Sequence, residues 1–242
     1  MPQAGITQFL SHRSGNLAAG LVAVRLRAMT EAIDWTEFRN LAHLPEITLD
    51  VYQGMPEELS KRIEVVDGWL VRCESPEPSH QVIARNFANS LWAAVKETDR
   101  VKGTCHRVAN DVDVLIADAP RLHFRCPDVS VYRCVNEERG RWGRKPYAAD
   151  CLVVLEIVSA DSVTTDIRDK RAEYAAAGIP HYWIVRMTAN DGPAISVERF
   201  LLSADGVYVS LGMAVRGRDF NAVDVTDPLR VAITWQQLDD GL

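Results

Sequence analysis

The stretch "CLVVLEIVSADS", residues 151–162, places one carboxylate inside an apolar run that is typical of a buried β-strand. Around Glu156 the run consists of Cys, Leu, Val and Ile. Moving an ionised carboxylate from water into apolar surroundings is so costly that such a group is normally paired, hydrogen-bonded, protonated or bound to a metal. We therefore expect the fold to bring a partner to Glu156.

A second carboxylate is expected on the same face of the sheet. Side chains alternate across a strand, so three apolar residues share the face of Glu156: Leu152, Val154 and Val158. In "CPDVSVY", residues 126–132, Pro127 opens a strand that puts Asp128 on one face with Ser130 and Tyr132. If the two strands are neighbours, Asp128 and Glu156 converge.

A lysine is expected to meet these carboxylates from a helix at about residues 163–177, which Gly178 and Pro180 end. One stripe of this helix, with i, i+4, i+7, i+11 spacing, contains Val163, Ile167, Lys170 and Tyr174. Lys170 stands where an apolar residue is expected. Two carboxylates and an inward lysine are the equipment of metal-assisted phosphodiester hydrolysis, and they are equally compatible with a buried ion-pair cluster that has no turnover.

The order of the predicted elements indicates an α/β protein with a small mixed sheet flanked by helices. A hairpin turning at Asp67-Gly68 precedes a helix at 80–96 with Ser79 as its N-cap. Three strands, the second helix and a fourth strand follow, and the expected strands are 110–117, 128–133, 152–159 and 181–185. Apolar segments at 194–202, 206–212 and 229–235 indicate a C-terminal β extension.

Composition sets broad limits on the function. The 242 residues include 47% hydrophobic residues and have a net charge of −6, so any nucleic-acid-binding surface must be local. Five cysteines without a Cys-x-x-Cys pair indicate reduced thiols of a cytoplasmic protein, not disulfides or a zinc site. No segment is apolar enough to span a membrane. Residues 1–58 form an N-terminal arm, in which 1–28 are either a flexible leader or lie upstream of the true start at Met29.

Four segments resemble one known family. They are "RIEVVDGW", "SPEPSHQVIARNF", "CPDVSVY" and above all "LVVLEIVSADSVTTDIRDKRAEYAAAGIPHYWIV". Over about residues 60–235 the chain resembles the Uma2 family, which is grouped with the PD-(D/E)XK nuclease superfamily and labelled as restriction endonucleases. The resemblance implies a domain over 59–242 with a restriction-endonuclease-like core of helix, three strands, helix and strand.

The resemblance also implies roles for individual residues. Asp128 is similar to the aspartate of the PD element and Glu156 to the acidic residue of the E-x-K element, whose lysine is replaced by Val158. Lys170 resembles a lysine that has moved to the following helix, and with Tyr174 it forms a K-x-x-x-Y pair. The implied metal ligands are Asp128, Glu156 and the backbone carbonyl of Ile157.

Further candidates each have two interpretations. Glu64 matches a frequent family glutamate, or is an exposed hairpin carboxylate; His80 contacts phosphate or metal ligands, or is a solvated first-turn histidine. Asp111 and Asp113 add a ligand, or are exposed strand carboxylates. The segment at 136–147 either grips a phosphate backbone or is a solvated connection, and its cations are Arg139, Arg141, Arg144 and Lys145.

These observations lead to two expectations from different functional classes. The first is a cytoplasmic endonuclease that uses Mg²⁺ or Mn²⁺ to cut DNA, with Asp128 and Glu156 holding the metal and Lys170 aligning the attacking water. The second is a binding or assembly protein, in the form of a homodimer, that keeps the fold without cleaving DNA.

Overall fold

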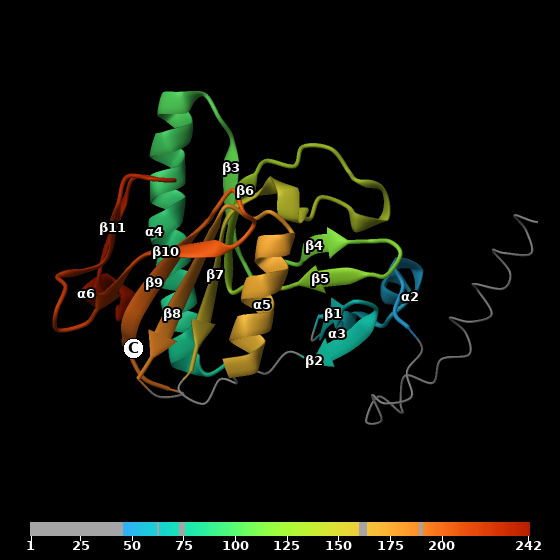
Figure 1. The fold of residues 1–242 in the computed structure, drawn as a ribbon, viewed down its shortest axis with the longest axis horizontal. Helices are drawn as coiled ribbons and strands as arrows, with labels where there is room; N and C mark the ends of the chain where they lie inside the picture. Colours follow the sequence, from blue (N-terminus) through green and yellow to red (C-terminus); the bar gives the residue numbers. More distant parts are fainter. Residues whose placement is uncertain (1–45, 62, 73–75, 160–163, 189–190) are drawn as a thin grey trace, which may run out of the picture.

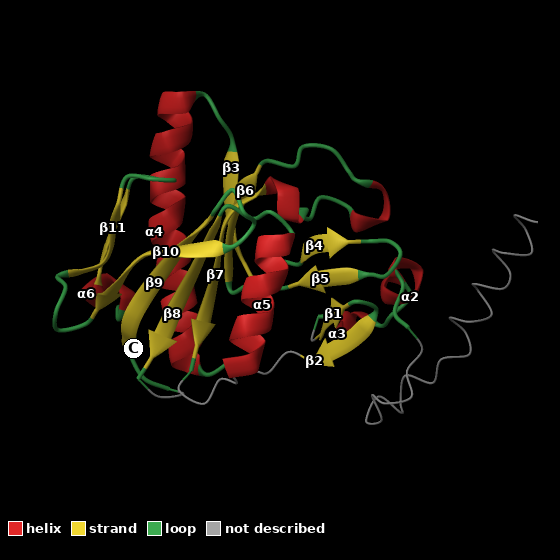
Figure 2. Ribbon diagram, viewed as in Figure 1, coloured by secondary structure: helices red, strands yellow, loops and turns green. Residues whose placement is uncertain are grey.

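The computed structural model describes residues 46–61, 63–72, 76–159, 164–188 and 191–242. A six-stranded sheet forms its centre, with α4 (Pro78–Lys102) on one face and α5 (Thr164–Ala176) on the other (Figures 1 and 2). Most of residues 1–58, including Met29, lie outside the described residues.

The central sheet has the order β10-β9-β8-β7-β6-β3. In that order its strands are Tyr208–Val215, Ala194–Leu202, His181–Met187, Cys151–Val158, Val129–Arg133 and His106–Asn110. The β7–β8 pair is parallel and the other pairs are antiparallel. The predicted mixed α/β class is therefore confirmed.

A smaller four-stranded sheet lies beside α5 and has the order β2-β1-β5-β4 (Figure 1). Its strands are Trp69–Arg72, Ile63–Val66, His123–Arg125 and Val114–Ala117. The predicted hairpin is β1–β2, and both turn residues, Asp67 (φ 49°) and Gly68 (φ 81°), have the positive φ that a type I′ turn requires. The short helices α2 (Leu49–Gln53) and α3 (Glu57–Ser60) precede it.

Three apolar cores hold these layers together. The α4-side core lies between α4 and the central sheet, and the α5-side core lies on the opposite face of that sheet. The small-sheet core is formed by residues of β1 and β5 together with residues from the segment of α2. Four residues of the segment assigned to the N-terminal arm belong to the small-sheet core: Ile47, Val51, Tyr52 and Met55. The C-terminal extension continues with β11 (Asn221–Val225), β12 (Val231–Thr234) and α6 (Trp235–Leu238). The last two pack against α4, and β11 contacts β9 and β10.

Two predicted elements have different bounds. The strand expected at 110–117 contains only the last residue of β3 (His106–Asn110) and the whole of β4 (Val114–Ala117). Asp111 adopts a left-handed conformation (φ 51°) and turns the chain from the central sheet into the small sheet. The helix expected at 80–96 extends from Pro78 to Lys102. Its N-cap is Glu77, not Ser79, because Pro78 fits the first helical position, where a missing N–H costs nothing.

The alternation expected for β7 fails at one residue. Val131 of β6 pairs with Val153 and the next residue, Tyr132, pairs with Cys151, so Leu152 is the extra residue of a bulge on β7. Leu152 packs on the α4-side core instead of sharing the face of Glu156. Past the bulge, Val154 and Val158 lie in the α5-side core as expected.

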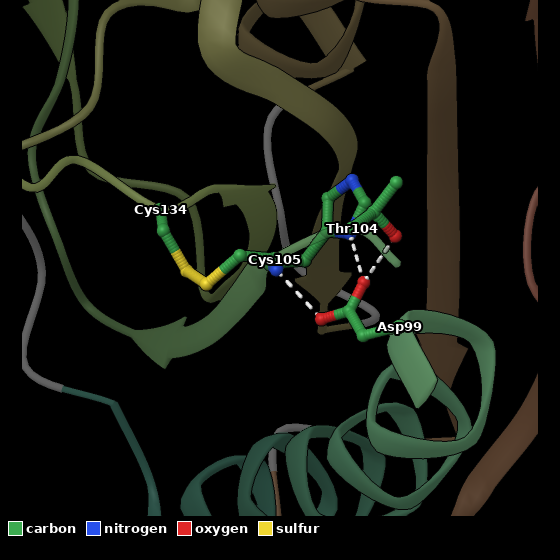
Figure 3. Close-up of a disulfide and its surroundings, with 5 residues drawn as sticks. Asp99, Thr104, Cys105 and Cys134 are labelled. Atoms are coloured by element: carbon green, nitrogen blue, oxygen red, sulfur yellow. Dashed lines mark hydrogen bonds and ion pairs between the residues drawn. A yellow bond between two sulfur atoms is a disulfide. The ribbon is translucent and has the colours of Figure 1, made fainter. Parts of the chain in front are cut away.

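The expectation that all cysteines are reduced thiols is wrong. Cys105 and Cys134 form a disulfide with a Cα–Cα distance of 5.4 Å (Figure 3). The two residues flank the antiparallel pair His106–Arg133, so strand pairing brings them together across 29 residues of sequence. Beside the disulfide, the Asp99 carboxylate accepts hydrogen bonds from the hydroxyl of Thr104 and the backbone N–H of His106.

Among the helices that the structure describes, none is long and apolar enough to cross a membrane.

Candidate active site

The pairing of β6 with β7 places the two predicted carboxylates side by side. Val129 pairs with Leu155, so the preceding residue, Asp128, lies opposite Glu156 on the α5 side of the sheet. The Asp128 Oδ2 accepts a hydrogen bond from the Ile157 N–H at 2.6 Å. This bond fixes the Asp128 carboxylate against β7.

Glu156 has the partners that its buried position requires. Its side chain is only 6% exposed; Oε1 accepts a hydrogen bond from the Tyr174 hydroxyl at 2.7 Å, and Oε2 accepts one from the Lys170 Nζ at 3.1 Å. Burial raises the pKa of Glu156 to about 7, although the Lys170 charge opposes the rise. The carboxylates of Asp128 and Glu64 raise it further, since each disfavours a second negative charge nearby.

Lys170 and Tyr174 reach Glu156 because they lie one turn apart on α5. The Lys170 side chain is mostly buried and its Nζ also lies 4.0 Å from Glu64 Oε1. Tyr174 is fully buried, and burial together with the Glu156 charge raises its pKa well above the ordinary tyrosine value, so it remains a hydrogen-bond donor. Ile167 packs against the α5-side core, whereas Val163 lies outside the described residues.

Glu64 is a buried member of the cluster and not an exposed hairpin carboxylate. Its Oε2 accepts a hydrogen bond from Arg125 Nη1 at 2.7 Å, and its Oε1 accepts one from the Cys126 N–H at 2.9 Å. Both contacts lie close to Asp128 in sequence. Glu64 therefore ties the first strand of the small sheet to the segment that carries Asp128.

Three residues of this cluster escaped the sequence analysis. Arg125, 4% exposed, donates to both oxygens of Glu173 at 2.6 and 2.8 Å, and His123 Nε2 lies 3.2 Å from the same carboxylate. Burial opposes the ionisation of Glu173, but its hydrogen bonds to His123 and Arg125 outweigh burial and lower its pKa to about 2. The available signals were the i+3 spacing of Glu173 from Lys170 and the position of Arg125 directly before the "CPD" segment.

His80 approaches the site from the first turn of α4 and is not a solvated histidine. Its Nε2 lies 3.1 Å from the Ile157 carbonyl oxygen and 3.3 Å from Asp128 Oδ2. A carbonyl oxygen can only accept, so Nε2 carries a proton. Burial lowers the pKa of His80, but the contacts with Asp128 and Ile157 outweigh it and the net change is upward.

Asp111 and Asp113 have different surroundings in the structure. Asp111 lies close enough to the site that its pKa is raised, first by burial and then by the Asp128 charge. Asp113 instead forms an ion pair with Lys145 and accepts a hydrogen bond from the Tyr52 hydroxyl at 2.9 Å.

The basic segment at 136–147 uses two of its cations within the chain. Lys145 pairs with Asp113, and Arg139 forms a two-point ion pair with Asp150. Arg144 is exposed, while the side chain of Arg141 lies outside the described residues. Arg144 is thus at the surface, and the Lys145 side chain is also 41% exposed despite its ion pair.

The oxygen donors of the site suit a hard divalent cation such as Mg²⁺. No group of three or more His, Cys, Asp or Glu side chains placed to hold a metal occurs in the described part of the chain. The expected ligand set needs only two such side chains, because its third donor is a backbone carbonyl. His80 Nε2 lies 3.1 Å from the Ile157 oxygen and 3.3 Å from Asp128 Oδ2, so these two oxygens face a common point, which the N–H of His80 occupies in the structure.

Comparison with known proteins supports the fold. The crystal structure of a protein from Anabaena variabilis, described as a "putative nuclease belonging to DUF820", is similar with a TM-score of 0.54 at 17% sequence identity. The match covers 80% of this chain and 98% of that chain. No functionally curated protein matches. The sequence model of the Uma2 family, described as "Putative restriction endonuclease", matches residues 49–232. Since that match covers most of the chain, this protein belongs to the Uma2 family.

Proposed function

We propose that the protein is a metal-dependent endonuclease that hydrolyses DNA phosphodiester bonds. One observation carries the proposal: Asp128, Glu156 and Lys170 meet where β7 ends beside the start of β6, in a chain of the family described as "Putative restriction endonuclease". Titratable groups with strongly shifted pKa values gather at functional sites, and Glu156 is such a group.

The ligands of Mg²⁺ or Mn²⁺ in this proposal are Asp128, Glu156 and the Ile157 carbonyl. When bound, such a cation polarises a phosphate oxygen and lowers the pKa of a coordinated water. Lone pairs remain for this, because each carboxylate oxygen can accept more than one contact. The raised pKa of Glu156 also fits, since a nearby cation favours the ionised carboxylate that burial disfavours.

The other residues of the cluster have distinct roles in the proposal. Lys170 donates a hydrogen bond to the attacking water, so that the water oxygen approaches phosphorus in line with the leaving oxygen. Tyr174 fixes the orientation of Glu156 through its 2.7 Å hydrogen bond. His80 holds Asp128 through its Nε2, while Glu64 and Arg125 position the segment before Asp128.

A plasmid-cleavage assay tests this function. Wild-type protein should convert supercoiled plasmid to nicked or linear plasmid only when Mg²⁺ or Mn²⁺ is present, and chelation of the metal should stop the reaction. Asp128→Ala, Glu156→Ala and Lys170→Met should each lower the rate by about 100-fold or more, as expected for groups that stabilise the transition state. The matched control is Glu58→Gln, which changes an exposed carboxylate on α3. Equal rates for wild type and all three site variants would refute the proposal.

A second candidate function, assembly without cleavage, is favoured by the edge strand β10. Three large apolar side chains on this strand are exposed, Val209, Leu211 and Met213, and among the described strands β10 has a neighbour on one side only. An apolar edge with no charged residue is a template for pairing with another copy of the chain. Sedimentation of wild type and of Val209→Lys/Met213→Lys tests this: a monomeric wild type would exclude assembly through β10.

A further inference from the structure

An exposed tryptophan lies on the same face of the small sheet as the buried Glu64. In the antiparallel pair β1–β2, Glu64 is opposite Val71 and Val66 is opposite Trp69. Directly opposite residues project from the same face, so Trp69 and Val71 share the face of Glu64. The alternate residues Ile63 and Val65 point into the small-sheet core on the other face.

This face looks toward α5 and the candidate active site. Glu64 Oε1 lies 4.0 Å from Lys170 Nζ, and the adjacent Arg125 binds Glu173 of α5. The hairpin is also held at its turn, because His123 lies 3.4 Å from Asp67 and 3.2 Å from Glu173. Trp69 lies two residues after Asp67 and therefore belongs to a hairpin that is fixed to α5.

Among the described residues, α5 packs over Glu64, whereas the outer strand β2 keeps an exposed face. Trp69 is 58% exposed and Val71 is 36% exposed, whereas Glu64 is 5% exposed. Trp69 is the diagonal cross-strand neighbour of Glu64, and such neighbours are separated by about 7–8 Å. The indole side chain is long enough to span much of that separation, so the ring lies within reach of a ligand that passes the carboxylates. Trp69 belongs to none of the three apolar cores.

We propose that Trp69, flanked by Val71, is a stacking platform for an unpaired nucleobase of the substrate strand beside the candidate active site. This inference rests on the proposed endonuclease function and narrows its substrate class. An indole stacks on any base through its π-face, but a base inside a duplex is already stacked on both sides. The preferred substrate is therefore single-stranded or locally melted DNA.

Binding of a short oligo-dT to the full chain, followed by tryptophan fluorescence, tests the proposal. The measurement uses Glu156→Gln as background, so that no cleavage is needed and binding is measured alone. Adding Trp69→Ala should weaken binding by about 10-fold and reduce the quenching, whereas Trp69→Phe should retain most of the affinity because phenylalanine still stacks. Trp92→Ala is the matched control: Trp92 is 53% exposed on α4, the helix on the opposite face of the central sheet.

Two further measurements separate stacking from a general loss of structure. An oligonucleotide that keeps its phosphates but has abasic positions should bind Trp69→Ala and its parent equally, and the parent should prefer single-stranded DNA to a duplex of the same length. Equal oligo-dT affinity of the Trp69→Ala and Trp92→Ala proteins would overturn the proposal, as would full affinity of the parent for the abasic strand. Failure of the endonuclease function would be seen instead as cleavage that is insensitive to Asp128→Ala, whatever the fluorescence shows.

Discussion

Replacing Glu156 with glutamine removes a buried negative charge while keeping the size of the side chain and an acceptor for the Tyr174 hydroxyl. In the wild-type protein, burial raises the pKa of Glu156 to about 7, from an ordinary value of 4.5. The folded protein therefore keeps a proton on Glu156 over a pH range in which the unfolded chain has released it. Within that range the free energy of unfolding falls as the pH rises.

The magnitude follows from the two pKa values. A difference of one unit between the two pKa values corresponds to about 1.4 kcal/mol. The free energy of unfolding of the wild-type protein should therefore fall by about 3 kcal/mol between pH 4.5 and pH 8 through this group alone. Below pH 4.5 Glu156 is neutral in both states and resembles glutamine. Glu156→Gln should thus match wild type at low pH and be the more stable protein at pH 8.

Urea unfolding at pH 4.5 and pH 8, with and without Mg²⁺, measures this difference. Comparing the two proteins at each pH cancels the titration of all other groups. Under the proposed function, Mg²⁺ at 100 times its dissociation constant should restore about 2.7 kcal/mol to wild type at pH 8 and little to the variant. If the two proteins lost stability in parallel as the pH rose, Glu156 would not be the buried titrating group described above.

Three other changes have defined expectations. Glu173→Gln should lower the free energy of unfolding by about 2–3 kcal/mol at pH 7. It should also remove the loss of stability that the low pKa of Glu173, about 2, predicts for wild type as the pH falls from 4.5 to 2. Urea unfolding at pH 7 and pH 3 measures both effects. Tyr174→Phe removes the donor 2.7 Å from Glu156, so unfolding should become easier by about 1 kcal/mol, and the pH at which Mg²⁺ begins to stabilise the protein should rise. Reducing the Cys105–Cys134 disulfide should cost about 3–4 kcal/mol for a loop of 29 residues, measured by unfolding with and without reductant, and Cys105→Ser should show no response to reductant.

Local patterns predicted the elements of the central sheet better than the course of the chain between them. The apolar run of β7, the Gly178 stop after α5 and the Asp67-Gly68 turn each encode their structure in adjacent residues. The small sheet could not be predicted in this way, because β1 pairs with β5 across some 60 residues of sequence. The disulfide was missed for the same reason: its cysteines are paired by the register of β3 and β6, not by any local spacing.

The site shows the same division between local and long-range information. Strand alternation and helical spacing are local, and they predicted that Glu156 and Lys170 face each other. In the structure Lys170 Nζ lies 3.1 Å from Glu156 Oε2. The position that holds lysine in an E-x-K element is here Val158, which is 7% exposed and packs in the α5-side core. Because α5 packs over that part of β7, its own lysine reaches the Glu156 carboxylate. An ammonium group in a strand position buried in the same core would lack water and would need a further carboxylate. The helix position leaves Lys170 15% exposed, between Glu156 and Glu64, and so supplies the same charge at a smaller desolvation penalty.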